Sequence, residues 1–173
     1  IRRAGGTPVP LPGAEIFTAL QTGAIDATEW VGPYNDASVG LHKAAQYYYY
    51  PGWQEPGPGL ETIIHKEAWD SLPADLQALV SLACQAITTD MAAEYTNGNA
   101  NSLAQLAQDP NIEIRPFPDE VLAYLRDIAK EIIDELMAND PAAMKIGTAY
   151  FEYLDKASAN SRITEMAYLD ARQ

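Results

Sequence analysis

The sequence predicts an α/β fold, and three observations lead to this class. Short segments that favour extended structure alternate with a helical segment over the first 64 residues. The remaining residues are dominated by Ala, Leu, Ile, Asp and Glu in helical periodicity. A chain of 173 residues with 47% hydrophobic content is also long enough to form a real apolar core. We therefore expect strands and site loops early in the chain and helical packing later.

A strand–helix–strand pattern opens the chain. Residues 7–11 (TPVPL) are expected to be extended, because proline fixes its own φ and disfavours a helical residue before it. Residues 13–22 follow as a helix with apolar residues on one face and Gly23 at its end. Residues 24–27 (AIDA) are predicted to form a brief buried strand. This order favours a βαβ unit whose second strand leads into the loop at 28–35.

Two further strands and a short helix are predicted next. Residues 47–50, all tyrosine, have strand-forming character, and the run rich in Pro and Gly at 51–59 is expected to be irregular. Residues 60–64 are another candidate strand. Residues 65–72 are predicted to be a short helix that Pro73 ends. Several strands therefore lead into loops in this part of the chain.

The rest of the chain is predicted to be mainly helical. A long helix begins at Ala74, because apolar residues recur along it at spacings of three and four. The Asn97-Gly98-Asn99 run is expected to kink this helix, and an edge-type strand ended by a proline follows at 112–115. Another amphipathic helix covers 121–136, and the chain is expected to be helical again after Pro141. The apolar stripe of the long helix consists of Leu76, Val80, Ala83, Ile87 and Met91.

The composition restricts the possible partners. The formal net charge is −13 at pH 7 and the pI is about 4.3, so nucleic acids and anionic membrane surfaces would be repelled. An anionic ligand would need a local positive site, and a bound cation suits an acidic protein best. The single cysteine, Cys84, excludes a disulfide within the chain. The chain lacks an initiator methionine and residues 1–6 read as a helix end, which suggests a fragment lacking part of its binding cleft.

Two loops combine carboxylates with tryptophan. The first contains Glu29 and Trp30, and the second contains Trp53, Gln54 and Glu55. Aromatic walls with a few polar groups, on loops that follow strands, are typical of small-molecule sites in α/β proteins. Two carboxylates also suit Na⁺ or Ca²⁺, which take oxygen ligands. The alternative is that the tryptophans belong to the core and the carboxylates are solvated loop charges.

Six short motifs resemble a known family. They are residues 9–13 (VPLPG), 15–27 (EIFTALQTGAIDA), 30–36 (WVGPYND), 40–43 (GLHK), 52–56 (GWQEP) and 69–73 (WDSLP). These motifs resemble the extracytoplasmic solute-binding subunits of TRAP transporters, the DctP-like family. The resemblance covers essentially the whole chain and is most specific in the first sixty residues. It is strongest to the branch that binds 2-oxo acids or lactate together with a metal ion.

The resemblance implies a cation site beside a ligand site. A Na⁺ or Ca²⁺ ion that bridges ligand and protein would be held by the Glu29 carboxylate, the Trp30 backbone carbonyl and Glu55. Such an ion also explains why carboxylates line a site for an acid, because a buried carboxylate is costly unless it is paired or coordinated. The carboxylate-binding arginine of the family lies upstream, and neither Arg2 nor Arg3 replaces it. The residues expected at the ligand are Trp30, Tyr34, Asn35 and Gln54.

The resemblance also implies an architecture and partners. The expected fold is one lobe plus the long helices of a two-lobed periplasmic binding protein, which closes over its ligand by a hinge motion. Residues 1–64 would supply the ligand-site loops and strands, 65–140 the helical packing and edge strand, and 141–173 the C-terminal helix. The loaded protein would deliver a small organic acid to membrane permease subunits. A homodimer through the C-terminal helix is expected, with a helix folded back on its own lobe as the alternative.

Two other functions are compatible with the residues. A metal-assisted lyase could use Glu29 and Glu55 as acid and base around the same ion. A structural partner protein could use its C-terminal helices as a binding surface. Turnover of a 2-oxo or 2-hydroxy acid would identify the lyase, whereas the absence of any ligand-induced thermal shift would identify the structural protein.

Overall fold

A computed structural model describes residues 1–55, 57 and 59–172 of the chain. Two prolines of the run at 51–59, Pro56 and Pro58, lie outside the described residues. The other members of that run form bends and unpaired segments, so the predicted irregular structure is confirmed for them.

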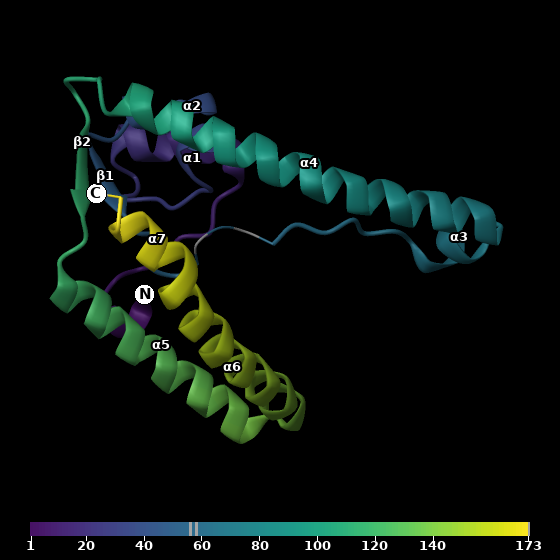
Figure 1. Cartoon of the computed structure of the whole chain (residues 1–173). Helices are drawn as coiled ribbons and strands as arrows, with labels where there is room; N and C mark the ends of the chain where they lie inside the picture. The colour runs from purple at the N-terminus through teal and green to yellow at the C-terminus, as the bar shows by residue number, and fades with distance from the viewer. Residues whose placement is uncertain (56, 58, 173) are drawn as a thin grey trace. The chain divides into compact units, whose positions relative to one another are not determined.

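The backbone divides into two compact units. Unit 2 runs from Thr7 to Pro118, and unit 1 combines residues 1–6 with the segment that begins at Asp119. Residues 65–140 contribute to both units. Figure 1 shows the helices and strands of each unit.

Unit 2 contains a pair of parallel strands, with helices before them and between them. Its elements are α1 (Gly13–Thr22), α2 (Pro33–Ser38), the 3-10 turn η2 (Leu41–Lys43), β1 (Tyr47–Tyr50), α3 (Lys66–Asp70), α4 (Ala74–Leu106) and β2 (Glu113–Pro116). Tyr47 lies opposite Glu113 and Tyr50 opposite Pro116. Parallel strands need a long crossover connection, which α3 and α4 provide here. The α/β class is thus confirmed, as are the strand of four tyrosines and the strand near residue 113.

The strand predicted at residues 24–27 is wrong, and so is the short βαβ unit built on it. Helix α1 ends at Gly23, whose φ of 73° is the left-handed conformation that favours glycine. The N–H groups of Ala24 and Ile25 then both donate to the Ala19 carbonyl, at 2.9 and 3.3 Å. These amides are satisfied by the end of α1 and are not available to pair with a strand.

The other two early strand predictions are also wrong. Residues 7–11 and 60–64 contain no strand in the structure. Prolines in the first segment lack the N–H group that a ladder needs. In the second segment Leu60 and Ile63 are 67% and 83% exposed, so these two side chains are not buried in a core. An apolar run of this length becomes a strand only where a neighbouring strand or core receives it.

The run Asn97-Gly98-Asn99 does not interrupt α4, which is continuous from Ala74 to Leu106. It is instead the place where α2 packs on α4 (Figure 1). A Cβ atom on Gly98 would lie 2.8 Å from Cδ1 and Cγ of the Tyr34 ring. Asn99 Oδ1 accepts the Tyr34 N–H at 3.0 Å. The glycine is therefore required by close packing and the second asparagine by a hydrogen bond.

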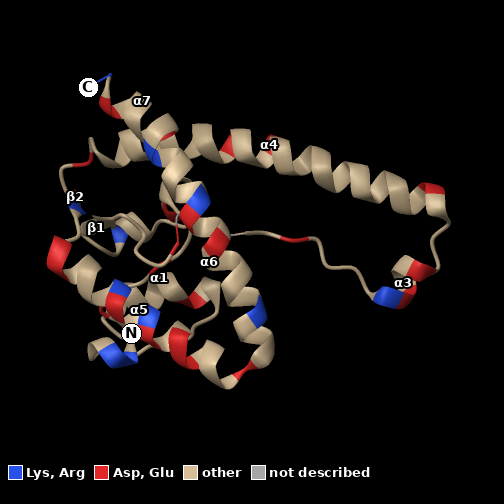
Figure 2. Ribbon diagram, turned by 60° about the horizontal axis from the view of Figure 1, so that its bottom comes forward, with Lys and Arg blue, Asp and Glu red and all other residues tan. Residues whose placement is uncertain are grey.

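The apolar stripe predicted for α4 is not buried within the chain. Leu76 and Ile87 are 42% and 55% exposed, and Leu79 and Leu82 on other sides of the helix are about as open. An apolar stripe of this kind is normally covered by another surface. Figure 2 shows how few charges α4 carries compared with α5. Within this fully described helix the charged residues are Asp75, Asp90 and Glu94.

Unit 1 is a set of helices, as the sequence predicts. Its elements are the 3-10 turn η1 (Arg2–Ala4), α5 (Asp119–Asn139), α6 (Pro141–Ser161), the π-helical turn η3 (Arg162–Met166) and α7 (Ala167–Asp170). Arg3 forms an exposed ion pair with Glu135 of α5. Asp140 caps α6 by accepting the Ala142 N–H at 2.7 Å. Helical structure thus continues from Pro141 to Asp170.

The described chain has a small core for its size. Among its hydrophobic residues, Leu41, Leu106 and Ile128 are exposed by 9% or less. Many large apolar side chains of the described residues are therefore left exposed. Within the described residues, each helix falls short of the length or the apolarity that a membrane span needs.

Replacing Gly98 by alanine tests the packing of α2 on α4. The added methyl group would overlap the Tyr34 ring, and overpacking costs about 1–3 kcal/mol, against the roughly 1 kcal/mol that alanine gains in helix propensity. We expect the free energy of unfolding, measured by urea denaturation, to fall by about 1 kcal/mol. In a Tyr34→Ala background the same change should stabilise the protein, because the ring is gone. A loss of stability in both backgrounds would contradict this packing.

Candidate ligand and cation site

The first site loop connects α1 to α2 and carries Glu29 and Trp30, both of which are exposed. The Trp30 side chain is 37% exposed, and its indole lies against the first residue of α1. A Cβ atom on Gly13 would come within 2.8 Å of the indole Cη2 atom, so glycine is needed there for the close approach. The indole is thus placed by α1 and keeps one part of its surface open.

Tyr34 and Asn35 lie in the first turn of α2 and face α4. The Tyr34 hydroxyl donates to Glu94 at 3.1 Å, and its ring meets Tyr95 edge-on with centroids 5.8 Å apart. Asn35 Nδ2 donates to the Tyr95 hydroxyl at 3.4 Å. Its Oδ1 atom is buried and has no hydrogen-bond partner within the described residues. The Tyr34 ring is therefore held by α4, while the Asn35 amide keeps one hydrogen-bonding position that no described residue uses.

A buried carboxylate holds the loop to its surroundings. Asp36 is 9% exposed, and its Oδ1 accepts the N–H groups of Val31 and Gly32, each at 3.2 Å. Its Oδ2 accepts the Tyr48 hydroxyl at 2.6 Å. Burial, and then the hydrogen bond to Asp36, raise the pKa of Tyr48 well above its usual range, so the phenol stays a proton donor. The hydrogen bonds of this one side chain, which belongs to α2, thus connect α2 to the first site loop and to strand β1.

The second site loop carries Gln54 and Glu55, and both side chains are exposed. The pKa of Glu29 is raised, first by partial burial, then by the nearby charge of Glu55 and then by that of Asp36. The predicted carboxylates of the two loops are therefore close enough to repel each other. Among the described residues, neither Glu29 nor Glu55 forms an ion pair with lysine or arginine.

This arrangement fits part of a cation site. Two carboxylates that interact and lack a basic partner are the kind of oxygen donors that Na⁺ and Ca²⁺ accept. The described residues contain no group of three or more His, Cys, Asp or Glu side chains placed to hold a metal ion. Calcium takes six to eight oxygen ligands, so backbone carbonyls and a bound acid would have to complete its coordination.

Sequence reasoning missed the residues that hold the site loop in place. Asp36 lies inside a motif that the sequence singled out, but no role was predicted for it. Its position in the first turns of a helix is a weak signal for a capping carboxylate. Tyr48 and Asn99, which complete the hydrogen-bond network, come from segments distant in the sequence, and their roles have no local signal.

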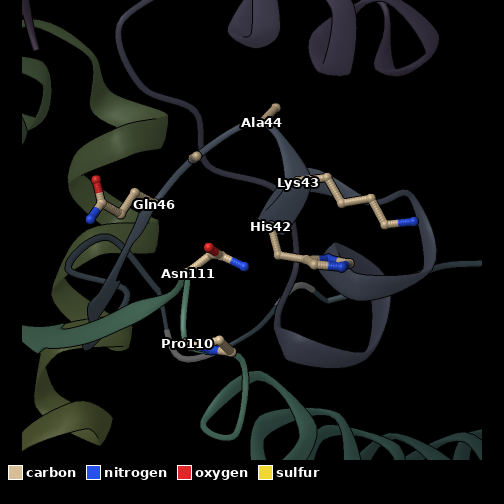
Figure 3. Close-up of a pocket in the computed structure, with 7 residues that line it drawn as sticks. His42, Lys43, Ala44, Gln46, Pro110 and Asn111 are labelled. Atoms are coloured by element: carbon tan, nitrogen blue, oxygen red, sulfur yellow. The ribbon is translucent and has the colours of Figure 1, made fainter.

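A separate pocket of about 430 Å³ lies within unit 2, near the N-terminal ends of β1 and β2 (Figure 3). It contains none of the predicted site residues. His42 contributes to it, and the Nδ1 atom of this imidazole is buried without a hydrogen-bond partner in the described chain. The residues that line the pocket are His42, Lys43, Ala44, Ala45, Gln46, Pro110 and Asn111.

Residues 1–140 match the family model of the bacterial extracellular solute-binding proteins, family 7 (DctP). The chain belongs to this family, as the motifs predicted. It is 36% identical, over 166 residues, to a monocarboxylate 2-oxoacid-binding periplasmic protein of Nostoc sp., an alignment that covers 96% of this chain and 45% of that protein.

Solved structures of TRAP periplasmic solute-binding proteins have the same fold. A protein from Colwellia psychrerythraea with bound calcium and pyruvate is 36% identical, with a TM-score of 0.93 over 98% of this chain and 52% of that one. One from Pseudoalteromonas atlantica, with sodium and pyruvate, is 39% identical with a TM-score of 0.91 over 98% and 51%. A Bordetella bronchiseptica protein, a mixed occupancy dimer with calcium and picolinate, is 30% identical with a TM-score of 0.93 over 99% and 51%. The chain spans about half the length of each of these proteins.

The raised pKa of Glu29 predicts a pH dependence of stability in the absence of metal. A carboxyl whose folded-state pKa exceeds its ordinary value of 4.5 binds a proton more tightly in the folded protein. The stability should therefore rise as pH falls through the raised pKa, and this contribution should be lost as pH rises above it. Glu29→Gln, which cannot ionise, should remove it. Melting temperatures in chelator across this pH window test the effect, with Glu61→Gln as control; parallel curves for wild type and Glu29→Gln would contradict it.

Proposed function

We propose that the protein carrying this chain is the periplasmic solute-binding component of a TRAP transporter. It captures a small organic acid, a 2-oxo acid such as pyruvate or else lactate, and delivers it to membrane permease subunits. One observation carries the proposal: relatives that are 36–39% identical over almost the whole chain hold pyruvate together with calcium or sodium. The 2-oxoacid-binding relative of Nostoc sp. supports the same ligand class.

The proposed cation ligands are the Glu29 carboxylate, the Trp30 carbonyl oxygen and Glu55. The like charges of the two carboxylates raise the energy of the site when both are ionised, and a bound Na⁺ or Ca²⁺ would remove this repulsion. The cation would supply the positive charge that an anionic ligand needs. The oxygen donors would come from two loops of the chain, one with Glu29 and Trp30 and the other with Glu55.

The proposed ligand contacts are Trp30, Tyr34, Asn35 and Gln54. Trp30 supports this role because its indole lies against Gly13 of α1 and the residue stays 37% exposed. Asn35 supports it because its buried Oδ1 atom has no partner within the described chain, and such groups are normally satisfied. Tyr34 is held by α4, so it would act as a rigid part of the wall.

The proposed protein binds its ligand and releases it unchanged. The alternative, a metal-assisted lyase with Glu29 and Glu55 as acid and base, would consume the acid. Incubation of the full-length protein with pyruvate or lactate and either cation, followed by nuclear magnetic resonance of the solution, separates the two. Recovery of the acid supports a binding protein, and the appearance of a product would replace that proposal with the lyase.

We further propose that the protein forms a homodimer through its C-terminal helix. Ile146, Tyr150 and Tyr153 form one exposed apolar stripe on α6, with 69%, 60% and 72% of their surface accessible. A contiguous apolar stripe of this kind usually marks an interface. The Bordetella bronchiseptica relative, described as a dimer, supports a second copy as the cover.

A charge in the α6 stripe tests the dimer. Tyr150→Glu should convert the full-length protein into a monomer at micromolar concentration, because burying a carboxylate without a partner is costly. Light scattering after size-exclusion chromatography measures the mass. Ile63→Glu is the matched control, since Ile63 is 83% exposed in unit 2. A monomeric wild-type protein, or a dimer that Tyr150→Glu leaves intact, would refute the proposal.

Glu29→Gln tests the cation site. The change removes one ligand charge at almost constant volume, so we expect the Kd for pyruvate in the presence of Ca²⁺ to rise at least about tenfold, or roughly 1.4 kcal/mol. Isothermal titration calorimetry on the full-length protein, with and without added cation, measures this. Glu61→Gln, which alters an exposed loop carboxylate, should bind as the wild type does. Equal affinities of Glu29→Gln and wild type in both conditions would mean that Glu29 is only a loop charge.

A further inference from the structure

One buried side chain connects the candidate cation site to the rest of unit 2. Asp36 accepts the N–H groups of Val31 and Gly32 through Oδ1, and the Tyr48 hydroxyl through Oδ2. Its own N–H donates to the Gly32 carbonyl at 2.8 Å. Both the side chain and the backbone of Asp36 are therefore fixed relative to the loop that precedes α2.

The geometry of the peptide group gives this contact a consequence for Trp30. The Val31 N–H and the Trp30 C=O belong to one planar peptide group, and in a trans peptide the two point in opposite directions. Among the described residues the cis peptide bond is Tyr50–Pro51, so the Trp30–Val31 bond is trans. A carboxylate that accepts the Val31 N–H therefore directs the Trp30 carbonyl oxygen away from Asp36.

We propose that Asp36 is a positioning residue that, through the Val31 amide, aims the Trp30 carbonyl oxygen at the cation. The inference rests on the proposed function, which assigns that oxygen to Na⁺ or Ca²⁺. The hydrogen bond also polarises the peptide group, which makes its carbonyl oxygen a stronger donor to a cation. Asp36 itself touches neither the cation nor the organic acid in this scheme.

The test compares three variants of the full-length protein, with Ca²⁺ alone as the probe in calorimetric titrations. Asp36→Ala removes the acceptor, and Ca²⁺ affinity should fall roughly 10- to 100-fold, the usual effect of losing a residue that orients a metal ligand. Asp36→Asn keeps an acceptor oxygen at the same reach and an amide that can donate to Tyr48. It also removes the negative charge that acts on Glu29, so its Ca²⁺ affinity should fall, but clearly less than that of Asp36→Ala, which loses the acceptor as well. An equal loss in Asp36→Asn and Asp36→Ala would overturn the proposal.

Tyr48→Phe is the control that separates positioning from stability. It removes a hydrogen bond to the same carboxylate and should lower the melting temperature, but it leaves the Val31 and Gly32 hydrogen bonds intact. Its Ca²⁺ affinity should stay within about twofold of wild type. If Asp36 acted through stability alone, affinity would fall in Tyr48→Phe in proportion to its loss of stability, and that result would refute a positioning role.

A measurement on the wild-type protein covers the case in which Asp36→Ala does not fold. The amides of Val31 and Gly32 should be protected from hydrogen exchange before any cation is added, because Asp36 already holds them. Amides that exchange freely until Ca²⁺ is present would overturn the proposal. A wild type that binds neither Ca²⁺ nor Na⁺ would refute the proposed function and this inference with it. A wild type and an Asp36→Ala variant that bind Ca²⁺ equally well would refute the inference alone.

Discussion

A single buried carboxylate determines where the first site loop lies. Asp36 receives three hydrogen bonds, from two backbone amides and one phenol. Burying a charge without partners is strongly unfavourable, whereas each hydrogen bond to a charged acceptor contributes about 1.5–3 kcal/mol. Three such bonds offset the cost of burial only when the loop, α2 and β1 keep their positions together. The exposed side chains of Glu29 and Trp30 thus belong to a loop whose backbone is held by hydrogen bonds to Asp36.

The long helix α4 gives this arrangement its rigid support. Over a short stretch it supplies Glu94, Gly98 and Asn99 to α2, and the Tyr34 ring occupies the space left by the glycine. Elsewhere α4 carries apolar side chains that the described chain covers only in part, among them Leu76, Leu79, Leu82 and Ile87. Exposed apolar side chains gain stability when another surface buries them. The chain spans about half the length of the relatives it matches, and within its described residues these side chains stay partly exposed.

The sequence predicted the helices well and the strands unevenly, and the difference has a physical cause. Helical periodicity over twenty or more residues is a local signal, so α4, α5 and α6 could be located from it. A strand of four residues forms only where a second strand pairs with it. The tyrosines of β1 pair with β2, whereas the N–H groups of Ala24 and Ile25 donate to the carbonyl of Ala19 in α1. Within the site, Glu29 and Glu55 were recognisable as acid–aromatic motifs. The network around Asp36 was not, because Tyr48 and Val31 meet it only in the folded chain.

In our proposal, the two site loops of this chain offer no positively charged side chain to a bound acid. The sequence has 24 acidic residues and 11 lysines and arginines, and neither site loop, at 23–32 or 51–59, contains a basic residue. Without a cation, Glu29 and Glu55 would repel a ligand carboxylate as they repel each other. In our proposal the positive charge of the cation outweighs this repulsion. The cation and the organic acid therefore each raise the protein's affinity for the other by the same factor. The backbone around Trp30 must then be ordered before the cation or the organic acid binds. If binding had to order this backbone, the free-energy cost would lower the affinity for both.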